Sequence, residues 1–422
     1  MIDEVAADET THSPAEPTLA RELGLVQIIL FGVGGIVGAG IYAIIGEAAA
    51  YGGSLLWLSF LIAAVVALMT AATYAELVSR FPDAGGSFEY VKRAFGLRFA
   101  LGASIVMFFT GVVAAGAIAI SFSSYLSRLL DLPQTLTTVA VISVMGLVNV
   151  GGAAQASWFN TLATAVTLVG LGAVVIVAAP DIGSVDLFDA QDTGLLGLGV
   201  GSALIFFSFI GFEDLVKLAE ETREPEKTLP RGLLISGVIV LVIYLLVAVA
   251  AVSALGPDEL SESSGPLAQI MDAEAGSGWA TAIVVVALFA TAKTVLSNIM
   301  GTSRLLFDVA RDAGLSWLER LTRINDTTKT PIIAVVSVTA VAIAFGAIGN
   351  LRVVAAISNI AIMIVFITVN LALLRIRATS DVEPPFKIPL SIGAFPITAL
   401  VAIVGTVALL ALNVVALLGI GQ

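Results

Sequence analysis

Residues 32–40 read G-V-G-G-I-V-G-A-G and lie within an otherwise apolar segment. Five of these nine residues are glycines, and each glycine inside a helix costs about 1 kcal/mol relative to alanine. In a bilayer, non-helical backbone persists only where it is buried in protein or lines a cavity, because its N–H and C=O groups have no other partners. The stretch therefore predicts a membrane helix that is broken in the middle, and such a break is a candidate ligand site.

The composition places the chain in a membrane. Of its 422 residues, 58% are hydrophobic and only 12% are charged, with a mean hydropathy of +1.02, whereas about 25% of the residues of a typical soluble protein are charged. The chain has no cysteine and a single histidine, His12 in a polar tail, so we expect no disulfide, no metal site and no cofactor. The net charge is −12 and no basic patch exists, which excludes nucleic acid as a partner.

Eleven apolar segments have the length of a helix that crosses a bilayer, roughly 18 residues or more. They are residues 25–50, 54–79, 99–128, 134–151, 157–179, 195–221, 231–255, 278–310, 331–349, 352–374 and 394–418. We therefore predict an all-α integral membrane protein with about 11 transmembrane helices.

Residues 1–23 contain several acidic residues and prolines and almost no large apolar side chains, which predicts a disordered acidic tail. The tail lacks the basic start and apolar core of a signal peptide. If it is cytoplasmic, all but three of the 20 lysines and arginines fall in inner loops; the exceptions are Arg128 and Arg352 outside and Lys293 within a span. Because inner loops are rich in lysine and arginine, we predict a protein of the cell membrane with its amino terminus cytoplasmic and its carboxyl terminus extracellular.

A second interrupted segment lies five spans after the first. Residues 204–214 read L-I-F-F-S-F-I-G-F-E-D, with a serine and a glycine between aromatic residues. The two interrupted spans run in opposite directions, and two five-span units of opposite direction, each opening with a broken helix, make an inverted-repeat secondary transporter. We assign residues 24–179 to the first repeat, 195–374 to the second and 375–422 to the last span.

The two breaks suggest a ligand. The half-helix that restarts at residues 38–40 presents free N–H groups and a positive dipole end, which suit a carboxylate. The half that ends at residues 34–36 presents carbonyls, and carbonyls of residues 207–209 complete a site for an ammonium group. An α-amino acid has both groups. Close helix packing is the alternative explanation for the glycines, since Gly34 and Gly38 have the small-xxx-small spacing.

Four longer stretches carry a family resemblance. They are G-G-I-V-G-A-G-I-Y-A-I-I-G (34–46), P-D-A-G-G-S-F-E-Y-V-K-R-A-F-G (82–96), F-F-S-F-I-G-F-E-D-L-V-K-L-A-E-E-T-R-E-P-E-K-T-L-P-R-G (206–232) and G-T-S-R-L-L-F-D-V-A-R-D-A-G (301–314). In combination they resemble the amino acid–polyamine–organocation permeases, over residues 24–418. The resemblance implies a five-plus-five inverted repeat that carries amino acids or amines by alternating access.

The resemblance also implies that the two breaks contact the substrate. The implied contacts are Val37, Gly38, Ala39, Gly40 and Ile41 in the first break and Phe206, Phe207, Ser208, Phe209 and Gly211 in the second. Phe209 is in addition a gate candidate. Two features depart from the family pattern. Many proton-coupled members have a lysine in span 5, where A-T-A-V-T-L-V-G-L (163–171) places Thr167, and twelve spans are usual where this chain has eleven.

Lys293 is an ionisable residue within an apolar span, and such residues are functional-site candidates. In one interpretation its ammonium takes the place of a sodium ion and loads and releases a proton. In another, Lys293 points elsewhere and a sodium ion is bound by oxygen atoms. Those oxygens belong to Thr294 and Ser297, with Asn298 as a further candidate, and to the carbonyls of Gly34 and Val37. A snorkelling or ion-paired structural lysine is the third alternative.

Glu213, Asp214 and Lys217 follow the second break, with Glu213 and Lys217 at the i,i+4 spacing of a helical ion pair. Glu213 is a candidate for a cytoplasmic gate or proton relay, and a structural ion pair is the equal alternative. Glu47 and Glu76 lie near the ends of their spans, where we expect solvated positions.

Together these features predict a secondary active transporter of amino acids, coupled to protons or sodium. Span 3 (99–128) is small and neutral in its middle, which favours a neutral substrate. An exchanger and a carrier of polyamines or cationic amino acids are the alternatives within the family. A channel or a membrane sensor is a different class, but the chain has no filter motif or ring of charge and no soluble output domain. No zinc-protease motif or cluster of metal-ligand residues lies within a span, so we expect no enzyme.

Overall fold

The computed structural model describes residues 21–82, 86–190, 194–313, 316–325, 327–380, 383–389, 391–393 and 395–418. Most of the tail predicted over residues 1–23, with His12, lies outside these residues. Its described end is attached to the end of the sixth span. The N–H groups of Glu22 and Leu23 donate to the carbonyl of Glu221 at 3.0 and 2.9 Å, and Leu23 forms a parallel β-bridge with Thr222.

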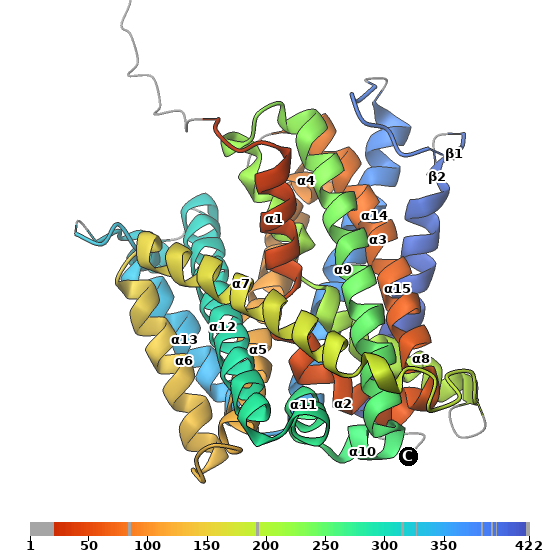
Figure 1. Cartoon of the computed structure of the whole chain (residues 1–422). Helices are drawn as coiled ribbons and strands as arrows, with labels where there is room; N and C mark the ends of the chain where they lie inside the picture. The colour runs from red at the N-terminus through yellow and green to blue at the C-terminus, as the bar shows by residue number, and fades with distance from the viewer. Residues whose placement is uncertain are drawn as a thin grey trace, which may run out of the picture.

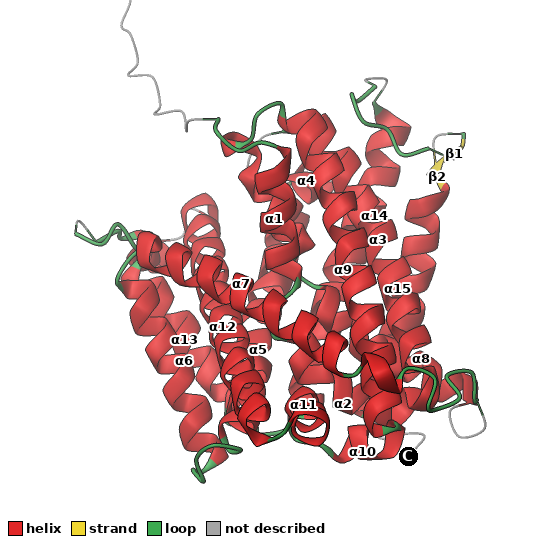
Figure 2. Ribbon diagram, in the orientation of Figure 1, coloured by secondary structure: helices red, strands yellow, loops and turns green. Residues whose placement is uncertain are grey.

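Each predicted span falls on helical structure (Figures 1 and 2). Spans 1 to 5 are α1 (Leu25–Ile36) with α2 (Gly40–Gly52), α3 (Leu56–Arg80), α5 (Leu97–Leu126), α6 (Gln134–Val150) and α7 (Ala153–Val177). Span 6 is α8 (Gly194–Ile205) followed by the 3-10 helices η3 (Phe206–Phe209) and η4 (Phe212–Glu221). Spans 7 to 11 are α9 (Pro225–Leu255), α12 (Ser277–Ala313), α13 (Ile332–Gly346), α14 (Leu351–Thr379) and α15 (Ile397–Leu417).

Within the described ranges, eight helical segments are long and apolar enough to cross a membrane, and three apolar helices are shorter. The shorter ones are α1, α6 and α13. α1 is short because its span is broken. α6 and α13 are the fourth and ninth spans, five spans apart, and they pack against each other. The predicted all-α membrane fold is confirmed.

Figure 1 shows the helices running between two ends of the molecule, with α7 crossing the others obliquely. The start of α1 lies at the same end as α4 (Gly86–Phe95), whereas α10 (Pro257–Glu262), α11 (Pro266–Ala275) and the carboxyl end of the chain lie at the opposite end. The first span thus begins, and the last described span ends, at opposite ends of the molecule, as an odd number of spans requires.

Several short elements lie between the spans and were not predicted. They are α4, α10, α11, the 3-10 helices η1 (Gly53–Leu55), η2 (Ala179–Asp181) and η5 (Ser316–Thr322), and the hairpin of β1 (Ser391–Ile392) and β2 (Phe395–Pro396). The sequence does contain a local signal for two of them. α10 and α11 each begin with proline at the first helical position, directly after Gly256 and Gly265, and proline is favoured there because that position donates no helical hydrogen bond.

Glu76 is not solvated, and the expectation for this residue was wrong. Its side chain is fully buried near the end of α3. Oε1 accepts hydrogen bonds from Arg377 Nε at 2.7 Å and Arg80 Nη2 at 2.9 Å, and Oε2 accepts from Arg377 Nη2 and from the backbone N–H of Ile388. The end of α14 and the segment after it cover α3 here, so the carboxylate exchanges water for two guanidinium groups.

Candidate functional site

The two broken spans meet at their breaks. Residues 37–39 separate α1 from α2, while α8 gives way to the 3-10 helix η3. A Cβ atom on Gly40 would lie 2.6 Å from the Cα of Ser208, and a Cβ atom on Gly211 would lie 2.6 Å from the carbonyl oxygen of Gly35. Gly211 also has a φ of +124°, which other residues rarely adopt. The glycines are therefore required for the two breaks to touch.

A broken helix leaves carbonyl groups without their usual partners, and side chains from other spans bind them here. The hydroxyl of Tyr244, on α9, lies 3.1 Å from the carbonyl oxygens of both Ile36 and Ser208, so one side chain links the two breaks. Asn359 on α14 and Asn413 on α15 donate to a single carbonyl near the end of α8, at 2.9 and 3.1 Å. Three spans outside the breaks thus fix their geometry.

Lys293, on α12, reaches the first break directly. Its Nζ donates to the carbonyl oxygens of Gly34 at 2.6 Å and Val37 at 3.2 Å and to Oγ1 of Thr164 at 2.9 Å. The side chain is 2% exposed. Among the described residues no carboxylate forms an ion pair with it. The ammonium therefore occupies the carbonyl groups at which the sequence also allowed a sodium ion, and three neutral oxygens accept its three protons.

The neighbouring polar residues of α12 bind other groups. Thr294 Oγ1 accepts a hydrogen bond from the N–H of Ala39 at 3.1 Å, at the start of α2. A Cβ atom on Gly38 would lie 2.6 Å from the same hydroxyl oxygen, so this approach also depends on glycine. Ser297 Oγ lies 3.4 Å from Oδ1 of Asn160 on α7. Thr294 therefore positions the second half-helix, while Lys293 holds the first.

The residue of α7 that faces the break is Thr164, one turn before Thr167. Thr164 accepts a hydrogen bond from Lys293, and a Cβ atom on Gly34 would lie 2.9 Å from Cγ2 of Thr164. Thr167 instead turns its hydroxyl back to the carbonyl of Ala163 at 2.7 Å. Thr164, and not Thr167, is therefore the threonine of α7 that contacts Lys293, and the match of Thr167 to the family lysine stays a prediction.

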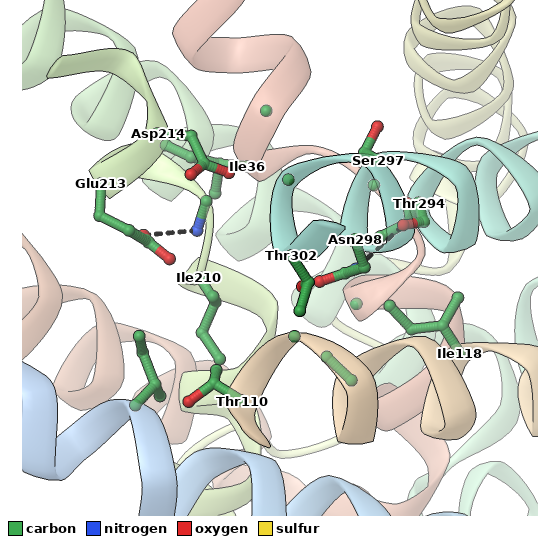
Figure 3. Close-up of a pocket in the computed structure, with 18 of the residues that line it drawn as sticks. Ile36, Thr110, Ile118, Ile210, Glu213, Asp214, Thr294, Ser297, Asn298 and Thr302 are labelled. Carbon is green, nitrogen blue, oxygen red and sulfur yellow. Dashed lines mark hydrogen bonds between the residues drawn. The ribbon is translucent and has the colours of Figure 1, made fainter. Parts of the chain in front are cut away.

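A cavity of about 130 Å³ lies between the breaks, α5 and α12. Figure 3 shows side chains converging on it from α5 and α12, with Glu213 and Asp214 on the side away from Ile118. The predicted substrate contacts on its wall are Gly38, Ala39, Gly40, Phe207, Ser208 and Gly211. The wall also has apolar and hydroxyl side chains, including Met107, Thr110, Ala114, Ile118, Thr302 and Ile362.

The other predicted contacts are buried away from this wall. They are Val37, Ile41, Phe206 and Phe209. The ring of Phe209, the gate candidate, packs edge-to-face on Tyr244 with 5.2 Å between centroids and on Phe60 with 6.5 Å. Phe209 therefore faces α9 and α3, and Phe207 is the aromatic residue of the second break that lies on the cavity wall.

The charged residues after the second break line the mouth of the cavity. Lys217 Nζ lies 2.5 Å from Asp214 Oδ1, and not on Glu213 as the i,i+4 spacing predicted. The reason is that η4 is a 3-10 helix, in which residues i and i+3 are eclipsed. Glu213 Oε2 instead accepts from the N–H of Gly211 at 2.8 Å, as Figure 3 shows. Because 64% of the Asp214 side chain and 43% of the Lys217 side chain are exposed, the cavity opens on this side.

Sequence reasoning missed four residues that build the site: Tyr244, Thr164, Asn359 and Asn413. All four are polar residues inside apolar spans. Such residues are the available signal, because a polar group at membrane depth needs a partner inside the protein. Nothing in the local sequence says which backbone carbonyl that partner is.

Comparison of the sequence with known proteins shows which proteins the chain is similar to. A sequence model described as amino acid permease matches residues 23–420. An uncharacterized transporter of Mycobacterium tuberculosis is 32% identical over 380 residues, which cover 88% of this chain and 84% of that protein. The branched-chain amino acid permease BcaP of Bacillus subtilis is 26% identical, over 90% of this chain and 86% of that protein. The vacuolar cationic amino acid transporter 4 of Arabidopsis thaliana is 28% identical, over 88% of this chain and 65% of that protein.

The motifs, the two broken spans and these relatives have one explanation. The family model covers nearly the whole of the chain, including both breaks and the span that carries Lys293. The chain is therefore a multi-pass membrane protein that belongs to the amino acid permease family, within the amino acid–polyamine–organocation superfamily.

Proposed function

We propose that this permease moves amino acids across the cell membrane by alternating access, and that it binds the main-chain groups of its substrate at the two breaks. The main observation in support of the proposal is that the start of α2 lies on the cavity wall. Its N-cap residue, Ala39, has no polar side chain to accept from the N–H groups of Gly40 and Ile41. A helix start of this kind attracts an anion, and the carboxylate of an amino acid is the anion expected there.

Few carbonyl groups at the two breaks remain free to bind the amino group of the substrate. Lys293 holds the carbonyls of Gly34 and Val37, and Tyr244 holds that of Ser208. The carbonyls of Gly35 and Phe207, both on the cavity wall, are the expected acceptors. The substrate side chain then faces α5, which supports a neutral side chain as the preferred one.

We further propose that Lys293 couples transport to protons. A protonated lysine satisfies three acceptors at once, whereas a neutral amine has two protons and a lone pair. Loss of the proton therefore releases one of the groups that fix the end of α1. A sodium ion at the same carbonyls must first displace the ammonium, so protons are favoured over sodium as the coupling ion.

The proposed orientation follows from the charges and the cavity together. With the basic loops cytoplasmic, the mouth at Asp214 and Lys217 faces the cytoplasm, and the structure is an inward-facing state. α10 and α11 then lie outside, together with the carboxyl terminus.

A second candidate function is exchange of cationic amino acids or amines. Glu213 supports it, because its carboxylate lies on the cavity wall while the neighbouring Asp214 pairs with Lys217. The cavity mouth thus has one carboxylate more than it has cations, and a cationic substrate side chain would fit there. A neutral substrate remains the first candidate, because the wall away from the mouth carries no charged side chain.

Uptake into proteoliposomes tests both candidates. A panel of labelled neutral and cationic amino acids is offered with an inward proton gradient, an inward sodium gradient, internal amino acid or no gradient. Proton-driven uptake of neutral amino acids is expected. Uptake that needs only internal substrate supports exchange, and sodium-driven uptake overturns the role given to Lys293. If no amino acid enters under any condition, the transport proposal is wrong.

A further inference from the structure

A second cavity, of about 350 Å³, lies at the opposite end of the molecule from the mouth described above. Its walls come from α2, from α5, from the segment that joins α10 to α11, and from the segment before α14. Polar and charged side chains dominate the wall, including Glu47, Ser121, Ser124, Gln134, Glu262 and Arg352. The wall therefore offers both charged groups and hydroxyl groups to a polar ligand.

Two opposite charges face each other in this cavity. Nε of Arg352, at the start of α14, lies 3.9 Å from Oε2 of Glu47 on α2, and Nη1 of Arg352 donates to the hydroxyl of Tyr51 at 2.7 Å. The Arg352 and Glu47 side chains are 30% and 37% exposed. An ion pair that is partly open to solvent is weak, and a ligand with complementary charges competes for both partners.

Only one layer of side chains separates the two cavities. Gly40 and Ile118 line the inner cavity, whereas Tyr42 and Ser121 line the outer one. Because an α-helix rises about 1.5 Å per residue, the two linings are only about 3 Å apart along α2. Tyr42 packs edge-to-face on Tyr125, whose hydroxyl donates to the carbonyl of Tyr42 at 3.3 Å. This contact closes the outer side of the proposed substrate site.

We propose that the outer cavity is a second binding site for a zwitterionic amino acid, occupied before the substrate passes the Tyr42 layer. The guanidinium of Arg352 binds the carboxylate of the ligand, for which its planar fork is well suited. Glu47 binds the amino group. The hydroxyls of Ser121 and Ser124 lie on the same wall. The inference rests on the proposed transport function, since it gives the site a place on the path of the substrate.

Charge complementarity identifies the ligand class. A simple anion would be attracted by Arg352 but repelled by the carboxylate of Glu47. A simple cation would be attracted by Glu47 but repelled by Arg352. A molecule with both charges on adjacent groups replaces the ion pair without leaving either partner alone. The wall also carries a second carboxylate, that of Glu262, so cationic as well as neutral amino acids are expected to bind.

The absence of cysteine from the chain gives a direct test. Ser124 is half-buried on the wall of the outer cavity, and in Ser124→Cys the only thiol of the protein lies at the site. The rate at which a membrane-impermeant maleimide labels this thiol is measured in proteoliposomes. External L-leucine and, separately, L-arginine are expected to slow labelling severalfold. 3-Methylbutylamine and 4-methylpentanoate, which are leucine without its carboxylate and without its amino group, are expected to have no effect.

Two sets of variants separate the outer site from the central one. Ala39→Asp places a carboxylate at the start of α2, where it competes with the substrate for the helix N-terminus; protection of the thiol in Ser124→Cys is expected to persist in this background. Glu47→Gln and Arg352→Gln are each expected to raise the protecting concentration about tenfold, since each removes hydrogen bonds to a charged group. Arg352→Lys keeps the charge and the fold and is expected to have a smaller effect.

Glu274→Gln is the matched control for Glu47→Gln. Glu274 lies on the same side of the molecule, in α11, but it is exposed and does not line the cavity, so protection is expected to be unchanged. Protection that disappears with Ala39→Asp, or that is the same in Glu47→Gln and Arg352→Gln as in the parent, overturns the inference. Uptake by the same proteoliposomes is the separate readout: uptake without protection refutes the outer site alone, whereas protection without uptake refutes the transport proposal alone.

Discussion

Lys293 is an ammonium group that only neutral oxygen atoms hold. Its three acceptors are two carbonyls of the first break and a threonine hydroxyl of α7. In a low-dielectric environment such a cation persists only because these acceptors replace its water shell. We therefore expect the charge of the lysine and the geometry of the break to be linked, so that the protonated and the neutral lysine favour different positions for the end of α1.

Replacing this ammonium is expected to uncouple transport. In Lys293→Met the carbonyls of Gly34 and Val37 lose their donor. A hydrogen bond to a charged group contributes about 1.5–3 kcal/mol, so initial proton-driven uptake is expected to fall about 10- to 100-fold. Uptake by the native protein is expected to rise when the outside is acidified, and the residual uptake of the variant to be indifferent to pH. Both are measured in proteoliposomes across a series of external pH values.

Lys227→Met is the matched control, because Lys227 is an exposed lysine that forms an ion pair with the nearby Glu224 at 2.9 Å. It is expected to transport as the native protein does. Full proton-driven accumulation by Lys293→Met would remove Lys293 from the coupling mechanism and leave it a structural role.

Ala39 offers a second test at the scale of one side chain. Ala39 is buried on the cavity wall, beside the N–H groups expected to bind the substrate. In Ala39→Asp the new carboxylate repels the carboxylate of the substrate and competes for these N–H groups, so uptake is expected to fall at least about tenfold. Ala39→Ser adds a neutral hydroxyl and is expected to lower uptake less. Equal uptake by all three proteins would place the substrate carboxylate elsewhere.

The breaks themselves are properties of whole elements. Glycines open α1 from α2 and α8 from η4, but the resulting ends are fixed by side chains on α7, α9, α12, α14 and α15. The two breaks are therefore not simply flexible segments. Each half-helix has identified partners, so a movement during transport has to exchange specific hydrogen bonds.

Tyr244 is the partner shared by both breaks, and Tyr244→Phe tests this role. The ring contacts with Phe60 and Phe209 are retained, while the carbonyls of Ile36 and Ser208 lose their common donor. Leaving buried carbonyls unpaired costs about 1–3 kcal/mol, so a lower melting temperature and slower uptake are expected.

The control for this substitution is Tyr125→Phe, which removes a hydroxyl that donates to the single carbonyl of Tyr42 at a longer 3.3 Å. It is expected to lower the melting temperature less. A thermal-shift measurement on both purified variants compares them directly, and an unchanged melting temperature for Tyr244→Phe would show that water replaces the hydroxyl between the breaks.

At the scale of the molecule, the sequence was most informative where the signal was local. Length and hydropathy predicted the eleven spans, and the glycines of residues 32–40 predicted the first break, because both depend only on neighbouring residues. The carbonyls of Gly34 and Val37 were named for a cation, and the structure puts the ammonium of Lys293 on them.

The sequence was least informative where the partner is distant or the helix type changes. Glu76 was expected to be solvated because it lies near the end of a span, and that position does not reveal its partner Arg377, 301 positions away. An ion pair of Lys217 with Glu213 was one of two equal alternatives from α-helical spacing, whereas the 3-10 geometry of η4 places Lys217 on Asp214. Tertiary packing decides both cases, and no local pattern records it.

The last prediction concerns the side of the membrane from which each cavity can be reached. The inner cavity opens beside Asp214 and Lys217 and has Leu305 of α12 on its wall, and the outer cavity has Ser124 of α5 on its wall. Because the chain has no cysteine, Leu305→Cys and Ser124→Cys each report one side. An impermeant maleimide is expected to label Ser124→Cys in intact cells and Leu305→Cys in inside-out vesicles. Val404→Cys, on the exposed face of α15, is expected to react in neither, since lipid covers it. The reverse labelling pattern would show that the proposed topology is inverted. Labelling of Leu305→Cys from both sides would show that the Tyr42 layer does not close the path and that the protein contains an open pore.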